Sequence, residues 1–193
     1  MERLTKGITE WLIANKAVDE KDRQLYEYAI HSMLITISPL FLVLIIGIVM
    51  GTLVEGVFLI IPFMCIRKFS GGYHAKSFRT CFVSSCGLLV LSMYLAAHID
   101  YALWVSALAV VSMISLSLWS PIDSENRRLE VDEKQQYRKT AILISVVFLF
   151  VHLLLLLLRL KELAVCIAVG LVLSAGLQLP CVIQLFRKEE KQS

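Results

Sequence analysis

Apolar runs alternate with short polar segments along most of the chain. A helix that crosses a bilayer needs about 20 predominantly apolar residues. The pattern predicts six such helices, over residues 33–54, 57–66, 80–97, 101–119, 140–158 and 163–186. The second run is short, so that helix either starts within the turn at 51–56, lies in a locally thinned bilayer, or re-enters without crossing.

The polar N-terminal segment, residues 1–29, has a different pattern. Its apolar side chains Leu4, Ile8 and Trp11 recur at helical spacing, with charged residues elsewhere on the helix surface. This pattern predicts an amphipathic helix that lies either on the cytoplasmic leaflet or against the cytoplasmic loops. Because the chain has no internal repeat and no low-complexity linker, residues 1–193 are expected to form one all-α integral-membrane domain.

The composition supports a membrane protein. Hydrophobic residues make up 58% of the chain and charged residues 18%, whereas a soluble domain has about 45–50% apolar and about 25% charged residues. A soluble globule of this length cannot bury so large an apolar fraction. The net charge of +3 is too small to indicate a nucleic-acid partner.

The basic residues are sorted between the two ends of the predicted helices. All but two of the 19 Lys and Arg residues lie in the N-terminal segment, in residues 67–79, in residues 127–139 or after residue 186. The two exceptions are Arg159 and Lys161. The positive-inside rule then places both chain termini and the loops at 67–81 and 120–139 in the cytoplasm, with six crossings between them.

The loop at residues 67–81 contains a thiol and an imidazole. A cysteine nucleophile needs a thiolate, which a nearby base, positive charge and a helix N-terminus all favour. Cys81 is therefore predicted in the first turn of the following helix, with His74 as its base. A continuous helix would separate their Cα atoms by about 10.5 Å, so a break between them is expected. Lys76 and Arg79 supply fixed positive charge.

The remaining cysteines and histidines show no metal-ligand spacing. We expect neither a metal site nor a cofactor, and we expect these histidines to form hydrogen bonds within the helical bundle. They are His31, His98 and His152.

Two segments resemble a known family. Residues 67–81 read RKFSGGYHAKSFRTC, which resembles the signature of the accessory gene regulator protein B (AgrB) family, the membrane peptidases of Gram-positive peptide quorum sensing. Residues 120–129 read SPIDSENRRL, which is similar to that family's Pro-containing cytoplasmic loop. The length and the hydropathy pattern agree, so the resemblance covers essentially the whole chain. It implies a homodimeric, multi-pass protein of the bacterial cell membrane.

The resemblance also implies a reaction. The protein would be a cysteine endopeptidase that removes the C-terminal tail of an AgrD-like signalling-peptide precursor. Cys81 would attack the scissile carbonyl, His74 would activate the thiol, and an acyl-enzyme thioester would form. An internal Cys or Ser of the precursor would then close a thiolactone or lactone ring, which gives the autoinducing peptide.

The sequence leaves alternatives for the residues that would support this reaction. Asp123, Glu125 or Asn126 either orients His74 or is a solvated loop residue. The oxyanion site is expected at the amides that begin the Cys81 helix or at the Gly71–Gly72 turn. Further basic residues either attract an acidic precursor tail or only set topology and contact lipid headgroups. They are Arg67, Lys68, Arg127, Arg128 and Lys134.

Two other classes of protein compete with a peptidase. A small membrane transporter or export component would need polar residues inside the bundle, yet no acidic residue lies in the middle of a predicted span. A membrane scaffold without chemistry leaves the polar composition of residues 67–81 unexplained.

Overall fold

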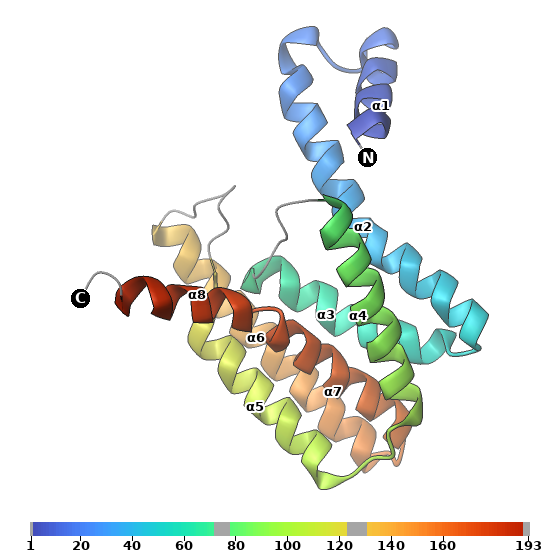
Figure 1. Ribbon diagram of the computed structural model, residues 1–193, viewed down its shortest axis with the longest axis vertical. Helices are drawn as coiled ribbons and strands as arrows, with labels where there is room; N and C mark the ends of the chain where they lie inside the picture. Colours follow the sequence, from blue (N-terminus) through green and yellow to red (C-terminus); the bar gives the residue numbers. More distant parts are fainter. Residues whose placement is uncertain (1, 72–77, 123–130, 191–193) are drawn as a thin grey trace. The chain divides into compact units, whose positions relative to one another are not determined.

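The chain is mostly helical in the residues that the computed structural model describes, which are 2–71, 78–122 and 131–190 (Figure 1). In that part of the chain no strand is present, which confirms the predicted all-α class. A short 3-10 helix at Glu20–Asp22 precedes the second α-helix. The α-helices are α1 (Glu2–Ala14), α2 (Arg23–Met50), α3 (Leu53–Ser70), α4 (Phe78–His98), α5 (Leu103–Trp119), α6 (Val131–Leu157), α7 (Lys161–Gly176) and α8 (Leu179–Glu190).

The chain divides into two compact units, Met1–Leu42 and Val43–Ser193. In the first unit, α1 has an apolar surface formed by Leu4, Ile8 and Trp11, whose side chains are exposed and line one hollow with Gly7. The predicted amphipathic helix is therefore present. Its place on the leaflet or against the loops, and the single-domain organisation, stay predictions.

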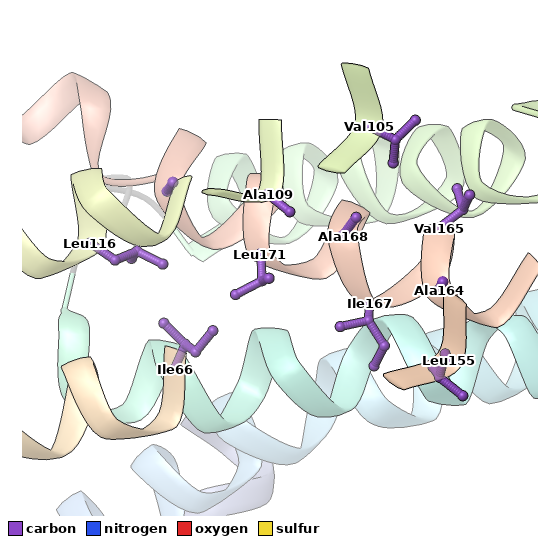
Figure 2. Close-up of a cluster of buried hydrophobic side chains, with 11 residues drawn as sticks. Ile66, Val105, Ala109, Leu116, Leu155, Ala164, Val165, Ile167, Ala168 and Leu171 are labelled. Atoms are coloured by element: carbon purple, nitrogen blue, oxygen red, sulfur yellow. The ribbon is translucent and has the colours of Figure 1, made fainter. Parts of the chain in front are cut away.

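α7 is the central helix of the second unit, where it packs against α3, α4, α5 and α6. Figure 2 shows side chains of α7 lying between those of α5 and Ile66 of α3. A buried apolar cluster joins the four helices α3, α5, α6 and α7. Its members are Ile66, Val105, Ala109, Leu116, Leu155, Ala164, Val165, Ile167, Ala168, Leu171 and Ala175.

Small residues allow α7 to approach α3 closely. A Cβ atom built on Gly170 would lie 2.6 Å from the carbonyl oxygen of Leu59 and 2.7 Å from Cγ of Pro62. Small residues at helix interfaces let backbones come together, which is how van der Waals packing replaces the hydrophobic effect between helices in lipid. Gly170 is therefore required by the packing of α7 on α3.

The outer surface of the second unit is apolar. On α6 the exposed side chains include Leu143, Phe150 and Leu157, which suit contact with hydrocarbon rather than water. Among the described residues, two stretches are long and apolar enough to cross a bilayer, Asp132–Leu157 and Lys161–Gln184. Shorter apolar helices cover Ile37–Met50, Cys86–His98 and Leu103–Trp119. These features agree with a membrane protein.

A buried histidine joins three helices at one end of the second unit. Nδ1 of His152 lies 2.8 Å from the carbonyl oxygen of Ala164, and Nε2 lies 2.9 Å from Oγ of Ser106. The hydroxyl of Tyr101 lies 3.1 Å from the same Ser106 oxygen. A carbonyl only accepts, so Nδ1 of His152 carries a proton and donates it to Ala164, while Nε2 forms a hydrogen bond with the Ser106 hydroxyl. The expected hydrogen-bonding role of His152 within the bundle is confirmed.

Several helices extend beyond the predicted apolar runs. α3 begins at Leu53 within the predicted turn and continues to Ser70, and α6 begins at Val131 rather than at residue 140. The loops predicted at 67–81 and 120–139 are correspondingly shorter. Hydropathy locates lipid-facing residues, whereas charged residues such as Glu, Lys, Gln and Arg are good helix formers and lengthen the helix into the polar region.

The sixth predicted helix, over residues 163–186, is interrupted. α7 ends at Gly176 and α8 begins at Leu179, with a turn at residues 177–178. Pro180 explains the break, because its ring has no N–H for the carbonyl of Gly176 and would clash with that carbonyl in a continuous helix. Pro180 is tolerated in the first turn of α8, where its missing N–H costs nothing.

The tight α3–α7 contact gives a testable prediction. Gly170→Ala is expected to lower the free energy of unfolding by about 1–3 kcal/mol, because the new methyl group overlaps the backbone of α3. Denaturation of the detergent-solubilised protein measures this. Gly176→Ala is the matched control, since nothing lies within 4 Å of a Cβ there. Equal stability of the two variants would contradict the role assigned to Gly170.

Candidate active site

Cys81 lies in the first turn of α4, which begins at Phe78. The backbone N–H groups of a first turn have no partner within the helix, and together with the helix dipole they favour a thiolate. Among the described residues Cys81 is thus close to the first residue of α4, with Arg79 in the same turn, and its role as the nucleophile stays a prediction. α3 ends at Ser70, and the break expected between His74 and Cys81 falls on residues 72–77, which lie outside the described residues.

Several other predicted site residues lie outside the described residues, and their proposed roles stay predictions. They are Gly72, His74, Lys76, Asp123, Glu125, Asn126, Arg127 and Arg128. The structure does describe the residues at which both polar connections begin, Gly71 after α3 and Ile122 after α5.

Gly71 and Ile122 form an isolated parallel bridge between these two connections. The amide of Ile122 donates a hydrogen bond to the carbonyl oxygen of Ser70 at 3.0 Å. Gly71 has φ +68°, and a Cβ atom there would overlap the carbonyl oxygen of Ile122. Glycine is thus required at residue 71 by the contact with Ile122, which explains this glycine without a substrate. Its predicted oxyanion role stays a prediction.

A buried carboxamide joins the same two connections. Nε2 of Gln178, in the turn between α7 and α8, donates to the carbonyl oxygen of Ser70 and to Oγ of Ser120, both at 3.0 Å. The exposed fractions of Ser70, Ser120 and Gln178 are 0%, 4% and 1%. We call these three residues the Gln178 clasp. Because the Ser70 carbonyl only accepts, the amide nitrogen must face it, which fixes the orientation of the carboxamide.

The Gln178 clasp satisfies backbone groups at a helix end. The last carbonyls of an α-helix lack intrahelical partners, and the Ser70 carbonyl at the end of α3 receives donors from both Ile122 and Gln178. The two hydrogen bonds of the carboxamide are together worth about 1–3 kcal/mol, and leaving a buried partner unpaired costs a similar amount. The clasp therefore fixes the starting points of two connections that are distant in sequence.

One atom of the carboxamide has no partner within residues 2–71, 78–122 and 131–190. Oε1 of Gln178 is buried and, among the described residues, has no hydrogen-bond donor. An unpaired buried acceptor costs about 1–3 kcal/mol, so an apolar side chain of similar size would be less costly at this position. Such a group calls for an explanation beyond packing.

Basic and aromatic side chains surround the same end of α3. Arg67 is half-buried, and its Nη1 donates to the carbonyl oxygen of Gly71 at 3.0 Å. Lys68 is exposed, and its Nζ lies 5.5 Å from the ring centroid of Phe69. That ring contacts Tyr137 of α6 edge-on, with centroids 5.5 Å apart. Arg67 thus has a structural contact, and attraction of an acidic peptide by either cation stays a prediction.

Sequence reasoning missed the Gln178 clasp. The available signal was a lone glutamine inside an apolar run, since polar residues within membrane segments are costly and usually functional. No pattern identified Ser70 and Ser120 as its partners, because they lie 108 and 58 positions away in the chain. Among the described residues, no group of three or more His, Cys, Asp or Glu side chains is placed to hold a metal ion.

Comparisons with known proteins match almost the whole chain. The sequence profile of the family described as accessory gene regulator B matches residues 5–184. "Putative AgrB-like protein 2" of Clostridium perfringens (strain 13 / Type A) is 24% identical over 164 residues, which cover 80% of this chain and 76% of that protein. "Putative AgrB-like protein" of Clostridium perfringens (strain SM101 / Type A) is 23% identical over 163 residues, with the same two shares.

No solved structure gives a significant match to this chain. The family profile covers far more than half of the sequence, including the connection with His74 and Cys81 and the turn with Gln178. The chain therefore belongs to the accessory gene regulator B (AgrB) family.

Proposed function

We propose that this protein is a membrane cysteine endopeptidase that removes the C-terminal tail of an AgrD-like precursor and promotes its cyclisation. The observation that carries the proposal is the position of Cys81 in the first turn of α4, directly after the connection that contains His74. Membership of the AgrB family implies involvement in quorum sensing, an AgrD-like partner and a membrane location.

The proposed first step is attack by Cys81 on the carbonyl carbon that precedes the precursor tail. His74 accepts the thiol proton and delivers it to the leaving amine as the C–N bond breaks. The products are an acyl-enzyme thioester and the free tail. The chemistry requires a basic nitrogen near Sγ, and the proposal is supported by the sequence, in which His74 precedes Cys81 by only seven residues.

The proposed second step forms the ring. An internal thiol or hydroxyl of the precursor attacks the thioester carbonyl, the C–S bond to Cys81 breaks, and the cysteine regains its proton. Thioester exchange with a thiol changes the bond type little, so the outcome depends on holding the nucleophile close and excluding water. The apolar outer surface of the second unit supports this proposal, because it allows lipid to border the site.

We also propose six crossings with both termini in the cytoplasm, and assembly as a homodimer. The ends of α3, α5 and α7 meet at the Gln178 clasp, while the starts of α5 and α7 meet the end of α6 at His152. This alternation supports a serpentine path in which the connections after α3 and α5 lie on the same side. The short α3, with 18 residues, is about 27 Å long and close to the thickness of a bilayer core.

The peptidase proposal predicts the effect of two substitutions. In cells that express the protein with its AgrD-like precursor, Cys81→Ala is expected to reduce release of the tail by about 1,000-fold or more, because the nucleophile is lost. His74→Ala is expected to reduce it by about 100-fold or more, because the base is lost. Mass spectrometry of the tail and of the cyclic product measures both.

Cys86→Ala is the matched control, since Cys86 lies on α4 about one turn beyond Cys81 and is expected to be silent. Continued release of the tail by Cys81→Ala would contradict the proposed mechanism. An inactive Cys86→Ala together with an active Cys81→Ala would assign the reaction to the other thiol.

The topology gives a separate prediction. Starting from a variant with all native cysteines replaced by Ala, Asp100→Cys is expected to react with a membrane-impermeant maleimide in intact cells. Gln135→Cys is expected to react only after permeabilisation. Both side chains are exposed, so accessibility across the membrane rather than burial determines labelling. Labelling of both from outside would contradict the proposed path.

A further inference from the structure

Gln178 lies where three segments of the second unit meet, at the end of α3, the end of α5 and the turn after α7. We propose that Gln178 is a positioning residue for the peptidase reaction, because it holds Ser70, where the connection to His74 begins, together with Ser120, where the connection after α5 begins. This inference rests on the proposed function and adds a residue to it.

The geometry separates Gln178 from an ordinary structural glutamine. Its amide nitrogen makes no hydrogen bond to its own helices but donates to Ser70 and to Ser120, one on each connection. Ser174, one turn earlier and equally buried, donates to the Gly170 carbonyl of its own helix. The hydroxyl of Ser174 forms its hydrogen bond within its own helix, whereas the carboxamide of Gln178 forms hydrogen bonds with two segments that are distant in the sequence.

Oε1 of Gln178 gives a second argument. It is buried without a donor among the described residues, so within that part of the chain Met or Leu would avoid an unpaired acceptor here. A position selected only for packing is better filled by those residues. A carboxamide at this position is explained if its two donors serve the reaction as well as stability.

The Gln178 clasp acts on the connections through their first residues. Gly71 directly follows Ser70, and Ile122 follows Ser120 after Pro121, so the clasp and the Gly71–Ile122 bridge fix both starting points together. The clasp residues are not placed at reacting atoms. Their effect is positional, and a displacement of about 1 Å in a catalytic group can reduce a rate by about 100-fold.

The test compares Gln178→Met with Ser174→Ala in the full-length protein in lipid vesicles. Gln178→Met keeps the length of the side chain and removes both N–H donors. Ser174→Ala removes a buried hydroxyl whose hydrogen bond lies within its own helix. Turnover of the AgrD-like precursor is expected to fall by about 10- to 100-fold for Gln178→Met, with KM close to wild type. Ser174→Ala is expected to keep wild-type turnover.

Alkylation by iodoacetamide supplies a readout that needs no precursor. Peptide mapping follows the rate at Cys81 against pH, with the exposed Cys65 as an internal reference. Gln178→Met is expected to raise the pH midpoint of alkylation at Cys81 and to leave Cys65 unchanged, because the base is no longer held beside the thiol. The melting temperature is measured on the same samples, and it is expected to fall only modestly, as the loss of two hydrogen bonds requires, while the protein stays folded at the assay temperature.

A double-mutant cycle tests the hydrogen bond itself. If Gln178 acts through Ser120, then Ser120→Ala lowers turnover alone but has little further effect in the Gln178→Met background. Additive effects of the two substitutions would show that they act independently and would overturn the proposed coupling.

The outcomes separate this inference from the proposed function. Cleavage that does not depend on Cys81 would overturn the function and the inference together. Cleavage that depends on Cys81, with wild-type turnover and alkylation in Gln178→Met, would overturn the inference alone. A large fall in melting temperature together with lost turnover and altered alkylation at Cys65 as well as at Cys81 would assign Gln178 a general structural role instead.

Discussion

The carbonyl oxygen of Ser70 is the acceptor on which the arrangement of the polar end of the second unit depends. Three helices, α3, α5 and α7, end close together there, and helix ends present carbonyl groups that lack partners within the helix. In an apolar surrounding each unpaired carbonyl is costly, so donors must come from elsewhere in the chain. The amide of Ile122 and the carboxamide of Gln178 supply them, and in doing so they bring two connections together.

The rest of the second unit makes this contact possible. α7 is short, rich in small residues and buried between α3, α5 and α6, which brings its last residue to the ends of α3 and α5. Gly170 allows the close approach to α3, and Pro180 ends the helix so that Gln178 falls in a turn and reaches two neighbours. At the other end, both ring nitrogens of His152 form hydrogen bonds, one with Ser106 and one with Ala164. This side chain therefore helps to hold α5, α6 and α7 together. The proposed chemistry is therefore confined to one end.

The sequence predicted the helical class well, because hydropathy is a local signal. It misplaced the ends of α3 and α6, since charged helix formers extend a helix beyond its lipid-facing part without changing the apolar pattern. It joined α7 and α8, although Pro180 was a local signal for the break. The Gln178 clasp was out of reach, because it depends on which helices pack together.

Direct detection of the acyl-enzyme tests the central claim, that Cys81 at the start of α4 is the nucleophile of this site. The protein is mixed with a precursor whose internal nucleophile is replaced by Ala, quenched in acid and measured by intact-mass spectrometry. The account predicts an adduct equal to the precursor without its tail, mapped to Cys81 and released by hydroxylamine as expected for a thioester. Release of the tail with no adduct, or with the adduct on another residue, would contradict it.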